Sequence, residues 1–159
     1  MLKNSRNNNI HRIIDANLNR VKEGFRVCEE ITRFILDDHK FTVELKKYRH
    51  EIDSIVKKIY PVVLPNGRQT MFFCPTYKLL RGREVNSDVG RKNSRHELKR
   101  ANLQDIFWAN IQRVKESLRV LEEFSKLENK KAALRFKQLR YKVYEIEKKS
   151  FKKISALPS

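Results

Sequence analysis

Two stretches of the chain repeat polar side chains that could bind an anion. Residues 16–30 read ANLNRVKEGFRVCEE and residues 109–123 read ANIQRVKESLRVLEE, with ten of the fifteen positions identical. The repeated asparagines and arginines are Asn17, Arg20, Arg26, Asn110, Arg113 and Arg119. A guanidinium group binds phosphate or carboxylate through two parallel N–H groups. The chain has four glycines and no glycine-rich phosphate-binding motif, so a bound phosphate would be held mainly by arginine.

The same residues also admit a structural interpretation. On a helical wheel Asn17 and Asn110 fall inside apolar stripes, and a buried amide costs about 1–3 kcal/mol unless it is hydrogen-bonded. The two amides therefore either line a cavity or fix the register of packed helices. A Glu placed four residues before Arg or Lys stabilises a helix by about 0.2–0.5 kcal/mol, which accounts for most of the repeated charges without a ligand.

The elements that carry these residues are predicted to be helices. Apolar residues recur at spacings of three and four through both repeated stretches and through the segments that follow them. Downstream, KKYRHEI parallels KQLRYKV, which matches Arg49 with Arg140. Short turns join the helices of each pair, so we expect two αα-hairpins, at 9–60 and 99–150. The prediction is an all-α four-helix bundle whose duplicated hairpins are related by a pseudo-two-fold axis.

The connection between the hairpins, residues 61–98, has a different composition. It holds three of the four prolines and three of the four glycines, and the run around Pro65, Asn66 and Gly67 predicts a small β-hairpin. Arginines surround Asp88 in its second half. A connection this long inside a compact domain is usually functional, whereas a solvated basic loop is the alternative.

Composition limits the class of protein. The chain has 159 residues, which predicts a single domain spanning 1–159, and a net charge of +17. Such a charge attracts polyanions, either nucleic acid or phosphorylated small molecules. The longest apolar run is far shorter than the roughly 20 residues of a membrane helix. Two cysteines do not make a disulfide framework, and we expect a cytoplasmic protein with no membrane association.

These segments resemble a known helical family. RIIDANLNRVKEGFRVCEEITRFILDD, LKKYRHEI, the loop around Asp88 and ANIQRVKESLRVLEEFSKL followed by LRYKVYEIE are similar to the second, non-ribokinase family of hydroxymethylpyrimidine phosphate kinases. The resemblance runs from about residue 10 to residue 148. This family belongs to thiamine biosynthesis and often forms the N-terminal part of a fusion with thiamine-phosphate synthase. The chain is then either a stand-alone member or a separated domain.

The resemblance implies an activity and its co-substrates. It implies ATP-dependent phosphorylation of 4-amino-5-hydroxymethyl-2-methylpyrimidine phosphate to its diphosphate. Phosphoryl transfer depends mainly on positioning and charge neutralisation, with Mg²⁺ held by carboxylates. A phosphorylated pyrimidine and a nucleotide are the implied small-molecule partners, and thiamine-phosphate synthase is the implied functional partner.

Given that activity, we assign expected roles to the residues singled out above. Asp88 is the expected base or metal ligand, and Glu29 and Glu122 are the expected Mg²⁺ ligands. Asn17 and Asn110 are expected to read the aminopyrimidine edge, and Tyr141 or Tyr144 either to stack on that ring or simply to pack against neighbouring side chains. The expected phosphate-binding residues are Arg20, Arg26, Arg49, Arg113, Arg119 and Arg140, with Arg81 and Arg83 on a lid.

Two other functions remain open from the sequence. A basic helical module that binds nucleic acid would need a continuous basic face, but here arginines alternate with glutamates. A non-catalytic scaffold or regulatory domain for thiamine-phosphate synthase would have the same fold without a cavity. A cavity lined by Asn17, Asn110, Arg20 and Arg113 would favour the kinase over the scaffold. The active site lies either within one chain or across a homodimer.

Overall fold

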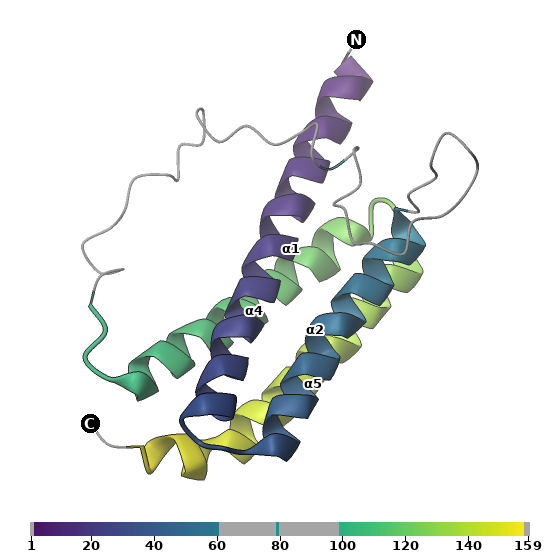
Figure 1. The fold of residues 1–159 in the computed structure, drawn as a ribbon. Coiled ribbons are helices and arrows are strands. Elements are labelled where there is room, and N and C mark those ends of the chain that lie inside the picture. The colour runs from purple at the N-terminus through teal and green to yellow at the C-terminus, as the bar shows by residue number, and fades with distance from the viewer. Residues whose placement is uncertain (1, 61–78, 80–98, 158–159) are drawn as a thin grey trace, which may run out of the picture.

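The four predicted helices are present in the computed structural model, which describes residues 2–60, 79 and 99–157 (Figure 1). They are α1 (Leu2–Phe34), α2 (His39–Ile59), α4 (Leu103–Ser125) and α5 (Lys130–Ser155). The described residues form helices and turns and contain no strand. The predicted all-α four-helix fold is therefore confirmed. The β-hairpin expected around Pro65, Asn66 and Gly67 lies outside the described residues.

The helices extend beyond the predicted hairpin boundaries. The first begins at Leu2, before the expected residue 9, because polar asparagines can continue a helix that has no apolar stripe to reveal it. The last runs to Ser155, since Ile146, Ser150 and Ile154 continue its buried face at a spacing of four. Sequence periodicity locates the buried part of a helix better than its ends.

Side-chain caps determine where three of the helices begin. Asp38 accepts a hydrogen bond from the backbone N–H of Phe41 at 3.0 Å, and Asn129 accepts one from Ala132 at 3.0 Å. Asn102 caps α4 in the same way. Each cap satisfies a backbone donor that has no partner inside the helix. The two hairpins therefore turn with equivalent caps, Asp in the first and Asn in the second.

The hairpins meet chiefly through α1 and α4, which cross one another while α2 lies against α5 (Figure 1). Phe25, Phe107 and Phe136 are fully buried in the shared core. Leu79, from the segment between the hairpins, is buried in the same core. The repeated face of α1 thus packs on the repeated face of α4, which brings the two copies of the polar motif close to the same crossing.

A glycine lets α1 and α4 approach closely on one side of this crossing. A Cβ atom on Gly24 would lie 2.9 Å from the carbonyl oxygen of Asn110 and 2.9 Å from Cγ2 of Val114. Both distances are shorter than a van der Waals contact. The repeat matches Gly24 with Ser117, so the two copies of the motif differ at the position that sets the helix separation.

One end of the bundle is closed by a buried polar contact. Nε2 of His11 on α1 lies 2.5 Å from Oε1 of Glu128 in the α4–α5 turn. The hydroxyl of Tyr60, just after α2, donates to the other carboxylate oxygen of Glu128. This contact joins three separate segments and fixes the end of α2 from which the chain continues to residue 61.

Candidate anion-binding site

The repeated glutamate and two of the repeated arginines form an ion-pair cluster in the first hairpin. Glu29 is 4% exposed, and its carboxylate accepts from Nε of Arg49 at 2.6 Å and from Nη2 at 3.2 Å. Arg26 lies 3.5 Å from the same carboxylate and 2.9 Å from Glu30. The cluster ties α1 to α2 through a bidentate contact, the stronger kind of arginine–carboxylate pair.

The second hairpin has an equivalent cluster. Glu122 is also 4% exposed, and it accepts from Nε of Arg140 at 3.1 Å and from Nη2 at 2.8 Å. Arg119 lies 2.9 Å from Glu122 and 3.0 Å from Glu123. Burial opposes the charge of Arg140, but its hydrogen bonds to Glu122 and Tyr144 outweigh that effect and raise its pKa. The four arginines of the two clusters therefore have carboxylate partners inside the fold.

These clusters bear on the predicted metal ligands. Both carboxylate oxygens of Glu29 and Glu122 accept from, or pair with, arginine, so Mg²⁺ would have to displace guanidinium groups. Within residues 2–60, 79 and 99–157 no group of three or more His, Cys, Asp or Glu side chains could hold a metal ion. The Mg²⁺ role of the two glutamates stays a prediction, and their contacts do not favour it.

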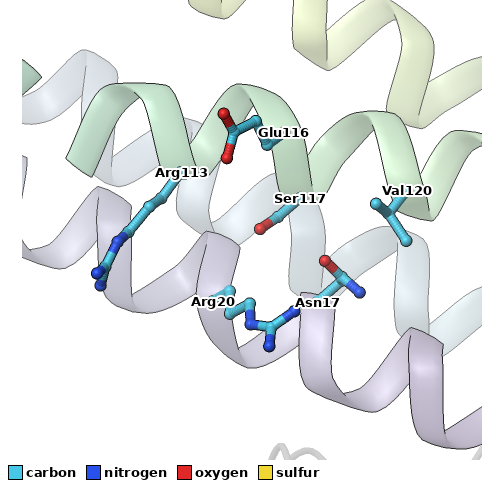
Figure 2. Close-up of a pocket in the computed structure, with 6 residues that line it drawn as sticks. All are labelled: Asn17, Arg20, Arg113, Glu116, Ser117 and Val120. Carbon is cyan, nitrogen blue, oxygen red and sulfur yellow. The ribbon is translucent and has the colours of Figure 1, made fainter. Parts of the chain in front are cut away.

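Arg20 and Arg113 differ from the other repeated arginines. Both side chains are exposed, and neither forms an ion pair with another described residue. They line a cavity of about 430 Å³ between α1 and α4, together with Asn17, Glu116, Ser117 and Val120 (Figure 2). In Figure 2 Arg20 extends along α1 towards Asn17, while Arg113 reaches from α4 across to α1. The cavity thus holds two guanidinium groups that are not neutralised by described carboxylates.

The two repeated asparagines have similar local bonds but different surroundings. Nδ2 of Asn17 donates to the carbonyl of Ile13 at 2.9 Å, and Nδ2 of Asn110 donates to Ile106 at 2.8 Å. Asn17 is 6% exposed and lines the cavity, whereas Asn110 is half-buried and is not among the lining residues. One N–H of each amide therefore has its partner within its own helix. Three of the four residues expected around a cavity, all except Asn110, are brought together.

The cavity has lining residues that the sequence interpretation missed or left unassigned. Glu116 and Val120 were not singled out, although each is identical to its repeat partner, Glu23 or Val27. Ser117 stands where the other copy has Gly24, and its buried side chain lines the cavity. Identity between the repeats could have found Glu116, but only the packing shows which copy of each pair borders the cavity.

The remaining predicted residues fall in two groups. Arg81, Arg83 and Asp88 lie outside the described residues, so their lid and catalytic roles stay predictions. Tyr141 and Tyr144 are surface residues, 52% and 39% exposed, so they do not belong to the buried core, and their stacking on the pyrimidine stays a prediction. Both belong to α5, and their ring centroids lie 5.8 Å apart.

Comparison with known proteins places this arrangement in a family. The ThiD2 family model matches residues 12–149, which include all of α2 and α4, most of α1 and α5, and both ion-pair clusters. The chain belongs to the ThiD2 family. The predicted place in thiamine biosynthesis is therefore confirmed, and the family match covers both copies of the repeat.

Curated relatives of this ThiD2 family member are longer proteins. Thiamine-phosphate synthase of Nostoc punctiforme is 35% identical over 139 residues, covering 87% of this chain and 34% of the relative. Those of Synechocystis sp. and Rhodopirellula baltica are 35% and 31% identical, covering 87% and 90% of this chain. The chain thus spans about a third of their length. No solved structure matches it. None of the described helices is long and apolar enough to cross a membrane.

Proposed function

We propose that the chain is a kinase that uses ATP to convert 4-amino-5-hydroxymethyl-2-methylpyrimidine phosphate to its diphosphate. The observation that carries the proposal is the pair of exposed guanidinium groups, Arg20 and Arg113, at one cavity between α1 and α4. Membership of the ThiD2 family supplies the pathway. A cavity with two cations suits a reaction that brings two phosphorylated molecules together.

The chemistry assigned to the cavity needs cations more than a base. An oxygen of the pyrimidine's own phosphate attacks the γ-phosphorus of ATP, the β–γ bridging P–O bond breaks, and ADP leaves with the bonding electron pair. The attacking phosphate is largely dianionic at neutral pH because its second pKa is about 6. No hydroxyl proton has to be removed, so a base role for Asp88 is less favoured than a metal-ligand role. Arg20 and Arg113 would offset the repulsion between the two anions.

The polar walls of the cavity would select the ring. Asn17 and Ser117 are buried and face the cavity from opposite helices (Figure 2). The amide of Asn17 has one N–H committed to Ile13, which leaves its oxygen and second N–H to pair with an aminopyrimidine. Glu116 is the carboxylate among the lining residues and suits a contact with the exocyclic amine. A substrate without phosphate would leave both arginines without an anion, so we expect a preference for the phosphorylated pyrimidine.

The test is a coupled assay of ADP formation. Purified protein is mixed with Mg-ATP, with and without hydroxymethylpyrimidine phosphate, and the diphosphate product is identified by mass. ADP release that requires the pyrimidine phosphate and yields equal amounts of diphosphate supports the kinase. Folded protein that forms no ADP with ATP, GTP or CTP would overturn the proposal.

A non-catalytic domain is the second candidate. It is favoured by one observation, that the chain spans about a third of relatives named thiamine-phosphate synthase. In that case the cavity would bind the pyrimidine phosphate or diphosphate and present it to a separate enzyme. Calorimetry separates the two candidates when it is combined with the ADP assay. A non-catalytic domain would bind the pyrimidine ligand in calorimetry but form no ADP.

A further inference from the structure

A second concave surface lies between α4 and α5. It encloses about 670 Å³ and is lined by Trp108, Tyr144, Glu147, Lys148 and Phe151. The ring centroids of Trp108 and Phe151 are 6.0 Å apart with an interplanar angle of 41°. Phe151 is 62% exposed. An aromatic ring held against another ring yet open to solvent offers a face for a flat ligand. We call these five residues the aromatic groove.

The groove is not part of the repeated framework. The repeat offsets pair three of its aromatic residues with residues of the first hairpin: Trp108 with Asp15, Tyr144 with Asp53, and Phe151 with Tyr60. Two of the first-hairpin positions are acidic, and Tyr60 is buried. The first hairpin therefore packs into the bundle without an aromatic residue at either of those two positions. Trp108 is half-buried and packs against Phe107 of the core, whereas packing of the helices does not account for the exposed rings of Tyr144 and Phe151 beside it.

Cations surround the rings of the groove. Arg140 lies 5.6 Å from the ring centroid of Tyr144 and donates to its hydroxyl at 2.7 Å. Lys115 lies 5.9 Å from the same centroid and pairs with Glu147. Lys148 is exposed and forms no ion pair with the residues that the structure describes. The groove thus combines aromatic faces with one cation on its rim, Lys148, that has no carboxylate partner among the described residues.

We propose that the aromatic groove binds a nucleotide, with the base on the rings of Trp108 and Phe151 and the phosphate at Lys148. Base–aromatic stacking tolerates any base because each has a π-face, and a cationic rim selects an anionic ligand. The volume falls within the usual range for small-molecule sites, about 300–1,000 Å³. Trp108 and Arg113 are about 140° apart around the axis of α4. The groove is therefore a second nucleotide site, separate from the cavity at which the proposed reaction brings ATP and the pyrimidine phosphate together.

The sequence supplies its own reporter for this site. Trp108 is the only tryptophan in the chain, so intrinsic tryptophan fluorescence reports on the groove alone. The protein is excited at the red edge of tryptophan absorption, to avoid absorption by the base, and is titrated with AMP, adenosine and inorganic tripolyphosphate. We expect saturable quenching by AMP, weaker quenching by adenosine, and none by tripolyphosphate.

Two matched variants test the assignment. Phe151→Ala removes a ring that is 62% exposed, so the fold should survive, and we expect AMP binding about tenfold weaker. Phe34→Ala removes a ring that is 64% exposed on the first hairpin, outside the groove, and should leave AMP binding unchanged. Lys148→Ala should weaken AMP binding but leave the affinity for adenosine unchanged.

The outcomes separate this proposal from the proposed kinase. Arg113→Ala should keep AMP quenching even if it removes ADP formation, and quenching in a protein with no kinase activity would still support the groove. The proposal is overturned if no nucleotide changes Trp108 fluorescence, or if Phe151→Ala and wild type bind AMP equally well. It is also overturned if fluorescence depends on protein concentration alone, because the groove would then be a contact between two copies of the chain.

Discussion

The repeated arginines divide into two kinds according to their partners. Arg26, Arg49, Arg119 and Arg140 contact buried glutamates, whereas Arg20 and Arg113 line the cavity without an ion pair among the described residues. Duplication alone does not distinguish the two kinds, because all six have a counterpart in the other half. The two kinds are distinguished by whether the folded chain places a buried glutamate beside the arginine.

At the cavity, Arg113→Ala should lower kcat/KM for the pyrimidine phosphate at least about tenfold, because a charged contact to phosphate is lost. The Tm should change by only a few degrees, since the side chain is exposed and stabilises no described contact. The control is Arg33→Ala, which removes an exposed arginine in the last turn of α1. It should leave activity unchanged. Equal activity of wild type and Arg113→Ala would remove this arginine from the mechanism.

At the ion-pair clusters, Glu122 and Glu123 form a matched pair because both contact Arg119. The side chain of Glu122 is 5% exposed and that of Glu123 is 40% exposed. Glu122→Gln should lower the free energy of unfolding by about 3 kcal/mol, because it leaves Arg140 charged and partly buried. Glu123→Gln should change it much less, because solvent screens the exposed pair of Glu123 and Arg119. Urea unfolding measures both values, and similar losses would contradict the structural role of Glu122.

At the scale of elements, the crossing of α1 and α4 determines on which side the cavity opens. Gly24 allows close approach on one side, where a Cβ would contact the backbone of Asn110. Ser117, its counterpart, lines the cavity on the other side. The two copies of the repeat thus differ at this position, which is Gly24 in one and Ser117 in the other. The helices are in close contact beside the glycine, and the cavity lies beside the serine.

Gly24→Ala tests this packing. Alanine favours a helix over glycine by about 1 kcal/mol, but its Cβ would meet Asn110 and Val114 at 2.9 Å. Overpacking of this kind costs about 1–3 kcal/mol, so we expect a net loss of stability in chemical denaturation. Ser117→Ala, the control, should change stability by less than about 1.5 kcal/mol. A more stable Gly24→Ala variant would show that the helices can separate freely at this point.

The cap of α2 gives a prediction about pH. Hydrogen bonds from Lys153 and from the backbone N–H of Phe41 lower the pKa of Asp38 below its ordinary 3.8. A carboxyl whose folded pKa is lowered stabilises the protein above its unfolded pKa, and this contribution is lost as pH falls through the folded pKa. Asp38→Asn keeps the kind of cap that Asn129 provides in the second hairpin. The variant should be less stable than wild type at neutral pH, and the difference should shrink below pH 3.8. Urea titrations that stay parallel throughout would contradict the prediction.

At the scale of the molecule, the charge of +17 favours anionic ligands of many kinds. Internal ion pairs do not change this net charge, but they place carboxylates among the described cations, as in the pairs of Lys22 with Asp53 and Lys142 with Glu51. Alternation of charge along the helices therefore favours a local anion site over a continuous basic face for nucleic acid.

The effect of inorganic phosphate on the Tm should distinguish anion binding at the cavity from nonspecific attraction to the net charge. At constant ionic strength, phosphate should raise the Tm more than chloride does, because a ligand that binds only the native state stabilises it. The double variant Arg20→Ala/Arg113→Ala should lose the difference between the two anions. An equal phosphate effect in wild type and the double variant would assign the stabilisation to the net charge instead of the cavity.

The sequence alone determined the four helices, their pairing into hairpins and the two halves of the motif. Apolar spacing gives this information directly, since a helix buries residues three and four apart regardless of its neighbours. The expectation of a polar cavity between the repeats also came from the sequence, through Asn17, Arg20 and Arg113. Helix ends were less well predicted, because Leu2 and Ser155 lie where side chains are polar and carry little periodic signal.

Tertiary structure decided which repeated charges are structural and which border the cavity. The sequence could not assign Glu29 and Glu122, because their arginine partners Arg49 and Arg140 lie on the other helix of each hairpin. It also could not separate Asn17 from Asn110, which have the same neighbours along the chain. Their difference arises at the crossing of α1 and α4, where a contact between helices far apart in sequence leaves one amide at the cavity and the other half-buried beside Gly24.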